Sequence, residues 1–432
     1  MIPNQLFNEA KKRNKKFKIA LVGCGWFGSG LYKELLRFDF FEVPIIFNRS
    51  TERARNILRK NGIPEEKITI AQTSQEIKEA REKGQITISS NLSLIKDLED
   101  IDLIFESTGS LLAGTESALF SFDAGIDFLT VNSEMDATVG LILAKKAREA
   151  GVLYSNVDGD QPGVLARMIE EVKLFGFKPK VVGSCKGFLD EHQNPKGVMP
   201  FVPKGQDPVK ICSFADGSKQ SFESVVIGNA YAMDILKEGM IGPKVPSRHD
   251  IVSHFAKENL LDENCYVDFV MGINGTDQGA GVFVLAHREG EEEQYDLKYL
   301  KKGEGPLYLF FRDHHLCYFE VPLTILQALL YKTPLLVPRT WTLDVATYAK
   351  RDLQAGQKLD DIGGFDCYGR IQKNTILQQE NTLPMGLIPF ATLKEDLAQD
   401  EPISYDKVEL EENVLVMLRR EQDELLKKGE IK

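Results

Sequence analysis

The sequence feature that most constrains the fold is a glycine-rich turn near the N-terminus. Gly23-Cys24-Gly25-Trp26-Phe27-Gly28 has the arrangement G-x-G-x-x-G and ends an apolar segment over 16–23. Leu31, Leu35 and Phe38 then recur at helical spacing. Between a strand and a helix, these glycines permit a tight turn, the approach of a pyrophosphate, and close helix–strand packing. The pattern predicts a dinucleotide site with phosphates at the helix N-terminus, and a purely structural turn is the alternative.

The first 160 residues alternate short apolar segments with charge-rich helical segments. The expected strands cover 16–23, 41–47, 102–106, 127–132 and 152–157. Nearly continuous apolar strands separated by helices indicate a parallel sheet that is covered on both faces. We therefore expect a doubly wound α/β domain of the Rossmann type over 1–160, binding NADP.

The pattern changes after this region, because β-like segments lie grouped together and helices lie apart from them. The expected strands cover 180–187, 266–272, 281–287 and 306–321. The expected helices cover 164–174 and 222–238. Such grouping is typical of an α+β domain, which we place at 161–340 as the catalytic and substrate domain.

A weak internal repeat marks the last predicted domain, a small β-rich unit over 341–432. Lys350-Arg351-Asp352-Leu353 matches Lys394-Glu395-Asp396-Leu397. Each half is expected to form two strands around a tight turn, at Ala355-Gly356 and at Gln399-Asp400. A charged helix over 411–428 follows.

Composition narrows the classes of function. The chain has 53 basic and 64 acidic residues, a net charge of −11, and no basic stripe, so nucleic acids and anionic membranes are not expected partners. No apolar stretch reaches the roughly 18 residues that span a bilayer. The six cysteines lie far apart without a C-x-x-C pair, which indicates reduced thiols. The basic segment 11–16 is interpreted as an N-terminal arm and not as part of a signal peptide, so a cytoplasmic protein is expected.

The end of the second strand indicates which dinucleotide binds. An NAD-binding domain places a carboxylate about 20 residues after the glycine turn, whereas this strand ends in Asn48, Arg49 and Ser50. Arg49 can pair with a 2′-phosphate, which favours NADP(H), and a surface arginine is the alternative. Ser107, Thr108 and Gly109 follow the strand expected over 102–106, and their small size would let the nicotinamide ribose come close. An ordinary strand-to-helix turn is the alternative. The predicted cofactor-binding residues are Gly23, Gly25, Trp26, Phe27, Gly28, Asn48, Arg49, Ser50, Ser107, Thr108, Gly109 and Asn132.

Acidic residues follow two later strands. Glu134, Asp158 and Asp160 lie where strands are expected to end. Carboxylates gathered there could hold a divalent cation such as Mg²⁺ or transfer protons. They could equally cap helices, which favour Asp at their N-termini.

Basic and polar residues of the second domain form another group. Lys186 and Lys219 are suited to holding a substrate phosphate or polarising a carbonyl, although Lys219 could lie on a surface hairpin. Asn194 and His315 are weaker candidates for orienting hydroxyl groups. His314 and His315 lie in an apolar context that is expected to be a strand, where alternation turns only one of them inward, and a core histidine remains an alternative.

Beyond these residues, the chain resembles homoserine-dehydrogenase-like oxidoreductases that carry a C-terminal SAF domain. The resemblance runs nearly end to end and is most specific at 23–28, 158–163, 186–195, 213–217, 303–306, 315–322 and 349–356. Homoserine dehydrogenases proper carry an Asn-Lys pair where this chain has Asn132-Ser133-Glu134, so their hydride-transfer lysine is absent.

Relatives with this architecture include the reductoisomerase-like enzymes. The resemblance implies that 1-deoxy-D-xylulose 5-phosphate is isomerised and reduced with NADPH to 2-C-methyl-D-erythritol 4-phosphate, an isoprenoid precursor. Lys186, Asp158, Asp160 and Glu134 would then be catalytic, and a homodimer is expected. The alternatives are a homoserine-type, sugar or sugar-acid dehydrogenase without rearrangement, and a non-catalytic NADP(H)-binding sensor.

Overall fold

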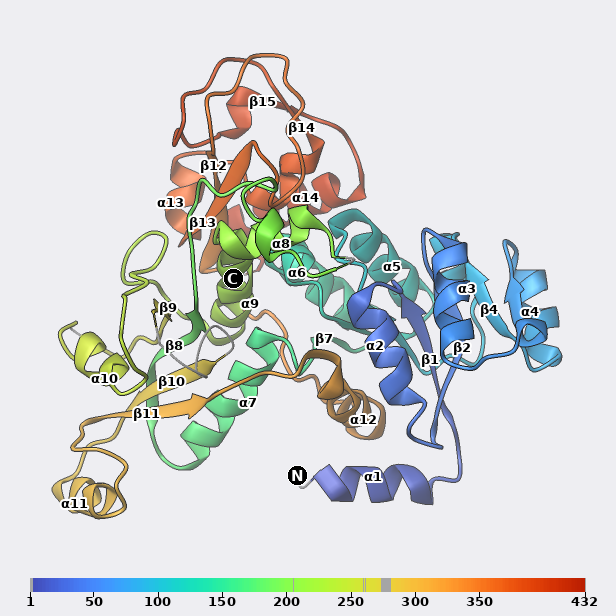
Figure 1. Ribbon diagram of the computed structural model, residues 1–432, viewed down its shortest axis with the longest axis horizontal. Coiled ribbons are helices and arrows are strands. Elements are labelled where there is room, and N and C mark those ends of the chain that lie inside the picture. The colour runs from blue at the N-terminus through green and yellow to red at the C-terminus, as the bar shows by residue number, and fades with distance from the viewer. Residues whose placement is uncertain (1–2, 205, 259, 261, 273–280, 432) are drawn as a thin grey trace. The chain divides into compact units, whose positions relative to one another are not determined.

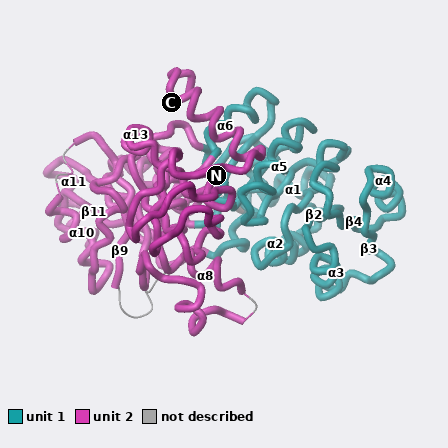
Figure 2. The backbone as a smooth tube through the Cα atoms, turned by 90° about the horizontal axis from the view of Figure 1, so that it is seen from above, with its two compact units in different colours: residues 1–135, 139–160, 316–337 teal, residues 136–138, 161–315, 338–432 magenta. Residues whose placement is uncertain are grey.

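The computed structural model describes residues 3–204, 206–258, 260, 262–272 and 281–431. The chain divides into two compact units (Figure 2): unit 1 comprises residues 1–135, 139–160 and 316–337, and unit 2 comprises 136–138, 161–315 and 338–432. The expected boundary after residue 160 coincides with a boundary between the units. The expectation of three consecutive domains differs from this division, because 316–337 returns to unit 1 and the C-terminal repeat lies in unit 2.

Unit 1 is built on a seven-stranded parallel sheet in the order β3-β4-β2-β1-β5-β6-β7. Figure 1 labels β1, β2, β4 and β7 of this sheet. Apolar residues of β1 are buried on both faces, as expected for a sheet covered on each side. This confirms the predicted Rossmann-type α/β class. Its elements are α1 (Pro3–Lys12), β1 (Phe17–Val22), α2 (Trp26–Leu35), β2 (Phe41–Phe47), α3 (Thr51–Lys60), β3 (Ile68–Ile70), α4 (Ser74–Glu82), β4 (Ile86–Ser89), β5 (Leu103–Glu106), α5 (Leu111–Asp123), β6 (Asp127–Thr130), α6 (Ser133–Glu149, its residues 136–138 counted in unit 2), β7 (Tyr154–Asn156) and α12 (Val321–Tyr331).

The five strands expected in this region are confirmed as β1, β2, β5, β6 and β7. Two further strands, β3 and β4, were not expected. Each has only three or four residues and lies between charged segments, so neither produces a strong apolar pattern.

The segment expected as a strand over 306–321 is a strand only as far as Arg312. His314 and His315 therefore lie in a loop and not in a strand. The apolar residues that follow form α12, in which Val321, Ile325 and Leu326 share a core with residues of β1. Apolar residues that continue to Val321 suggested a longer strand, but those after Arg312 form a loop and a short 3-10 helix over Cys317–Phe319. Pro322 in the first turn of α12 favours a helix start there.

Unit 2 contains a four-stranded mixed sheet in the order β11-β10-β8-β9, in which β8 and β9 are parallel. α7 packs on β8 and β10, while α9 packs against α7, β9, β12 and β13. The elements are α7 (Gln161–Leu174), β8 (Lys178–Lys186), α8 (Pro208–Ala215), α9 (Ser218–Tyr231), α10 (Asp250–Phe255), β9 (Tyr266–Met271), β10 (Val282–His287), α11 (Glu291–Tyr299), β11 (Leu307–Arg312), β12 (Leu343–Ala349), β13 (Cys367–Lys373), α13 (Asn374–Gln379), β14 (Ala391–Leu393), β15 (Val408–Leu410) and α14 (Val414–Lys427). The helix expected over 222–238 begins four residues earlier and ends at Tyr231, because Ala232 adopts a left-handed conformation.

The predicted C-terminal repeat folds with an internal two-fold pattern. Leu353 and Leu397, which occupy the same position in the two halves, exchange backbone hydrogen bonds of 2.9 and 3.0 Å. Asp352 accepts from the backbone of the second half at 2.9 Å, and Asp396 accepts from the first half at 2.8 Å. The two predicted turns are equivalent, with positive φ at Gly356 and at Asp400. The repeat is thus a structural one.

Among the helices of the described ranges, none has both the length and the apolar character needed to cross a membrane.

Candidate active site

The glycine-rich turn lies at the carboxyl end of β1 and opens α2, as predicted. Gly23 has a φ of +93°, and a Cβ there would lie 2.7 Å from the backbone nitrogen of Thr108. A Cβ on Gly28 would lie 2.2 Å from the Gly23 carbonyl oxygen. A Cβ on Gly25 would meet nothing within 4 Å. The first and third glycines are therefore required by the fold, while the second faces open space, as a pyrophosphate site needs.

The N-terminus of α2 has no side-chain cap, because Gly25 stands at the capping position. Its first-turn N–H groups are the kind of donors that bind phosphate. Trp26 is 54% exposed at this end of the helix. The Phe27 ring instead stacks on Phe105 of β5 with centroids 6.3 Å apart, so Phe27 packs beneath the turn.

Asn48 braces the turn from the end of β2. Its Oδ1 accepts from the backbone N–H of Cys24 at 2.9 Å, and its Nδ2 donates to the carbonyl of Ser50 at 2.7 Å. The Ser50 hydroxyl oxygen caps α3 by accepting from the N–H of Arg53 at 3.2 Å. The side chains of Asn48 and Ser50, which were predicted to bind cofactor, therefore shape the loop.

Arg49 and Arg53 are the two basic residues at this corner. Both are exposed, and neither forms an ion pair with another residue in the described part of the chain. Burial raises the pKa of the Cys24 thiol to about 11, and the nearby Arg53 guanidinium acts in the opposite direction. Arg53 therefore lies close to the glycine-rich turn. The sequence argument named only Arg49, although Arg53 follows it by about one helical turn.

A buried carboxylate organises the loops after β5 and β6. Glu106 accepts from the N–H of Thr108 at 2.7 Å and from the Thr130 hydroxyl at 2.6 Å, and burial raises its pKa. Asn132 is 1% exposed, caps α6 by accepting from Met135, and donates to the Ser110 carbonyl at 3.0 Å. The predicted cofactor residue Asn132 thus has a structural role in these loops.

The remaining predicted residues of this loop stand beside the turn. The Ser107 hydroxyl donates to the carbonyl of Gly23 at 3.2 Å. Gly109 is exposed and has a φ of +64°, which a glycine adopts without strain. Together with Thr108, these residues form a loop that packs against Gly23 and Gly28 of the glycine-rich turn.

The acidic residues of unit 1 are only partly brought together. Ser133 donates to Asp160 at 3.0 Å, which places the start of α6, where Glu134 lies, beside the end of β7. Asp158 is 3% exposed and accepts from the N–H of Gly159. Within the residues that the structure describes, no group of three His, Cys, Asp or Glu side chains is arranged to hold a metal ion. The binding of a divalent cation by these carboxylates stays a prediction.

Lys186 lies at the centre of a buried polar cluster in unit 2. Its ammonium group is 3.1 Å from Oε1 of Gln161, to which it donates, and 3.6 Å from Oε2 of Glu223. The side chains of Lys186 and Glu223 are 15% and 5% exposed. Gln220 joins the cluster by accepting from Ser184 at 2.9 Å. α7, β8 and α9 therefore converge on one lysine, which we name the Lys186 cluster: Gln161, Ser184, Lys186, Gln220 and Glu223.

The other predicted substrate residues lie elsewhere in unit 2. Lys219 is the second residue of α9 and is half-buried. The Asn194 side chain accepts from the N–H groups of Lys196 and Gly197 and so stabilises a tight turn. His315 is half-buried in the loop after β11. The roles of Asn194, Lys219 and His315 in binding a substrate stay predictions.

Sequence reasoning missed Gln220 and Glu223. The available signal was composition, because α9 is almost entirely buried and yet carries polar side chains at 218, 220, 221, 223 and 224. Buried polar groups require partners, so such a helix indicates a polar network.

Residues 159–321 match the family model described as the catalytic domain of the oxidoreductase DRL. The matched region contains the Lys186 cluster together with Asn194, Lys219 and His315. No curated protein matches this chain in sequence.

Solved structures show remote similarity. A DOX-P reductoisomerase in complex with NADPH, fosmidomycin and magnesium is 15% identical over 49% of this chain and 58% of that one, with a TM-score of 0.35. An aldose-aldose oxidoreductase from Caulobacter crescentus, complexed with glycerol, is 17% identical over 43% of this chain and 50% of that one, at 0.30. A dehydrogenase from Chromobacterium violaceum is 10% identical over 75% and 90%, at 0.40. The chain spans little more than half the length of the first two.

The match of residues 159–321 to an oxidoreductase catalytic domain and the Rossmann-type sheet of unit 1 together support an oxidoreductase of the NAD(P)-dependent class. The resemblance to homoserine dehydrogenases and to SAF domains stays a prediction.

Proposed function

We propose that the protein is an NADP(H)-dependent reductoisomerase of a phosphorylated ketose, converting 1-deoxy-D-xylulose 5-phosphate to 2-C-methyl-D-erythritol 4-phosphate. The observation that carries this proposal is the match of the DRL catalytic domain to the region that contains the Lys186 cluster. The chemistry of that cluster and the groups around the glycine-rich turn support it.

The residues around the turn fit NADP(H). The open space at Gly25 and the uncapped start of α2 suit the pyrophosphate. Arg49 and Arg53 would hold the 2′-phosphate, since neither is engaged by a carboxylate among the described residues. When bound, NADPH supplies the hydride that reduces a carbonyl.

Lys186 would bind an oxygen of the substrate that carries, or develops, negative charge. An ammonium group in a site shielded from water stabilises such charge more strongly than it would in bulk water. Glu223 is placed to balance Lys186 before substrate binds, and to exchange a proton with a substrate hydroxyl. Gln161 orients the lysine through its side-chain carbonyl.

The test is an assay of NADPH oxidation with 1-deoxy-D-xylulose 5-phosphate, with and without Mg²⁺, together with product analysis. K186M should lower kcat/KM by about a hundredfold or more, as loss of an oxyanion-stabilising donor does. K178M is the matched control, because Lys178 lies on the same strand, with its side chain 64% exposed and paired with Glu263. Equal activity of K186M and wild type would refute the assignment of Lys186.

A dehydrogenase of sugars or sugar acids is the second candidate, because it would use the same hydride transfer and the same lysine. It predicts reversible NADP-linked oxidation of such substrates, without a rearranged carbon skeleton. Turnover of a sugar acid or of homoserine, with none of the ketose phosphate, would replace the reductoisomerase proposal by this one. Tight NADPH binding without turnover of any of these substrates would favour the alternative of a non-catalytic NADP(H)-binding sensor.

A further inference from the structure

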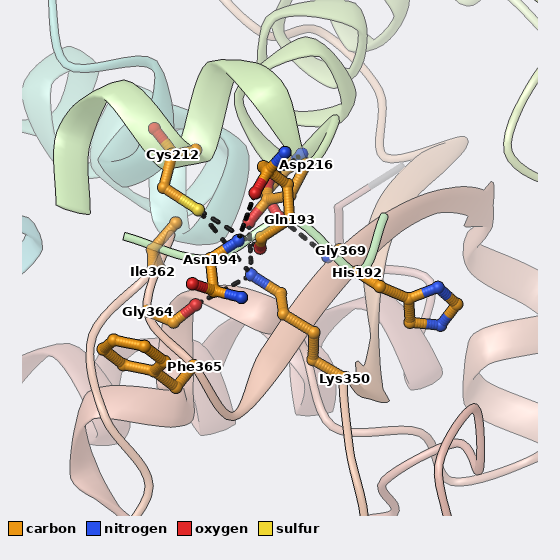
Figure 3. A network of polar contacts seen from close by, with 12 residues as sticks. His192, Gln193, Asn194, Cys212, Asp216, Lys350, Ile362, Gly364, Phe365 and Gly369 are labelled. Atoms are coloured by element: carbon orange, nitrogen blue, oxygen red, sulfur yellow. Dashed lines mark hydrogen bonds and ion pairs between the residues drawn. The ribbon is translucent and has the colours of Figure 1, made fainter. Parts of the chain in front are cut away.

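A second buried lysine lies outside the Lys186 cluster, where the C-terminal repeat meets the start of α9. Lys350 directly follows β12, and its side chain is 2% exposed. Its ammonium group donates to Oδ2 of Asp216 and to the carbonyl of Gly364, both at 2.8 Å (Figure 3). Asp216 is fully buried. Lys350 thus joins the repeat to the turn between α8 and α9.

The two oxygens of Asp216 have different partners. Oδ2 accepts from Lys350, while Oδ1 accepts from the N–H of Ser218, the first residue of α9, at 2.9 Å. Gly217 between them has a φ of +83°. The ion pair therefore fixes the orientation of the carboxylate that accepts from the first N–H group of α9.

The same corner ties α9 to β13. The Ser218 hydroxyl accepts from the N–H of Gly369 at 2.9 Å, and the Ser221 hydroxyl donates to the carbonyl of Gly369 at 3.1 Å. Gln220 and Glu223, which belong to the Lys186 cluster, follow within the first two turns of the helix. The position of their side chains thus depends on how the start of α9 is held.

The segment after Lys186 is held at this corner as well. The Cys212 thiol donates to the carbonyl of Gln193 at 3.2 Å and lies 4.0 Å from the ammonium group of Lys350. Asp190 donates its N–H to the carbonyl of Ala215 at 2.9 Å. Both α9 and the chain that leaves β8 are therefore anchored around one buried lysine.

We propose that Lys350 is a positioning residue for the Lys186 cluster, acting through Asp216 and the start of α9. A buried ion pair is a costly way to gain stability, because apolar residues of similar volume commonly serve as well. The Lys350–Asp216 pair instead fixes an orientation, because it directs the other oxygen of Asp216 toward the N-terminus of α9. The catalytic meaning of this role rests on the proposed function, whereas the placement of α9 does not.

The experiment compares K350M/D216N with K394M. The double variant removes both buried charges and keeps an oxygen acceptor at position 216. Lys394 occupies the same position in the second half of the repeat, but it is exposed, and among the described residues its ammonium group forms one hydrogen bond, to the carbonyl of Asp406 at 3.4 Å. Amide hydrogen exchange, NADPH affinity and steady-state kinetics with 1-deoxy-D-xylulose 5-phosphate are measured for both variants and for wild type.

The double variant should exchange amides at 216–224 about tenfold faster or more, because the start of α9 opens more readily. Its kcat should fall by about tenfold to a hundredfold with NADPH affinity unchanged, since small displacements of reacting groups have effects of this size. K394M should match wild type in every measurement. Exchange at 216–224 within about twofold of wild type would overturn the proposal.

Two other outcomes also test the proposal. If the double variant does not fold, K350Q replaces it, because an amide still donates one hydrogen bond in that position; exchange equal to that of K394M would then refute the proposal. If wild type does not turn over the ketose phosphate, the proposed function fails, while the exchange comparison still tests how α9 is held.

Discussion

Alanine substitution of two glycines in the same turn is expected to affect different properties: stability for Gly28 and NADPH affinity for Gly25. In G28A the new Cβ would lie 2.2 Å from the Gly23 carbonyl oxygen and 2.7 Å from the Ser107 hydroxyl. The nearer atom belongs to the backbone and cannot rotate away, so α2 must move off β1 by about 1 Å. Overpacking of this kind costs about 1–3 kcal/mol or more, while alanine inside a helix regains only about 1 kcal/mol.

We therefore expect G28A to lose about 2 kcal/mol of stability, which corresponds to a Tm lowered by about 4–8 °C in a unit of this size. In G25A the Cβ enters open space at a φ of −77°, so the Tm should change little. That Cβ nevertheless stands where the pyrophosphate must approach, and NADPH affinity should fall by about tenfold or more.

Thermal unfolding and NADPH titration of both variants provide the assay. The reasoning would be refuted by a G25A protein that binds NADPH as tightly as wild type. It would equally be refuted by a G28A protein with unchanged Tm, because the clash on which the argument depends would then be absent.

Three further predictions concern charge. R49A/R53A should weaken NADPH binding by about tenfold to a hundredfold and leave NADH binding unchanged, because only the 2′-phosphate loses its partners; parallel titrations check this. Burial raises the pKa of Asp268 from 3.8 to about 6, so the folded state holds this proton more tightly than the unfolded state does. The stability that the protonated Asp268 contributes is present below pH 3.8 and is lost as the pH rises to about 6. Thermal unfolding of D268N should therefore show a Tm that depends less on pH over that range than the Tm of wild type does. D352A and D396A should each cost about 1 kcal/mol in urea unfolding and should have similar effects, because the two carboxylates occupy equivalent positions in the repeat. A large inequality between these two would contradict that equivalence.

The sequence was most informative where one local rule decides the structure. The turn at 23–28 joins a strand to the helix that directly follows it, so its place was predictable from the local pattern, although the constraint on Gly23 comes from the distant Thr108. The matching halves at Leu353 and Leu397 predicted a structural repeat for the same reason. The strand expected over 306–321 is confirmed only over Leu307–Arg312, because apolar composition does not distinguish a strand from the loop and short 3-10 helix that follow it.

The candidate site was harder to predict, because its residues come from distant segments. Lys186 was found through its place at a strand end. Glu223, its partner, lies 37 positions later in a helix whose first turns the prediction omitted, and nothing local relates the two. Asn48 and Asn132 followed cofactor-side strands as expected, yet their amides hold loop backbone. Position at a strand end thus pointed to these loops but did not reveal which side chains the fold itself uses.

Lys186 and Lys350, two lysines of unit 2 that pair with carboxylates at α9, support one interpretation of this helix. Lys186 pairs with Glu223 on this helix, and Lys350 pairs with Asp216 immediately before it. Removing two charges from water in each pair carries a desolvation cost that attraction within the pair need not repay, so stability alone is a weak explanation. A helix that only filled the core would be more simply built from apolar residues. The Lys350–Asp216 pair orients the start of α9, and the Lys186–Glu223 pair holds a lysine in the polar cluster. We therefore explain these charges by the positions that they give to Lys186 and Glu223, and not by a gain in stability of the fold.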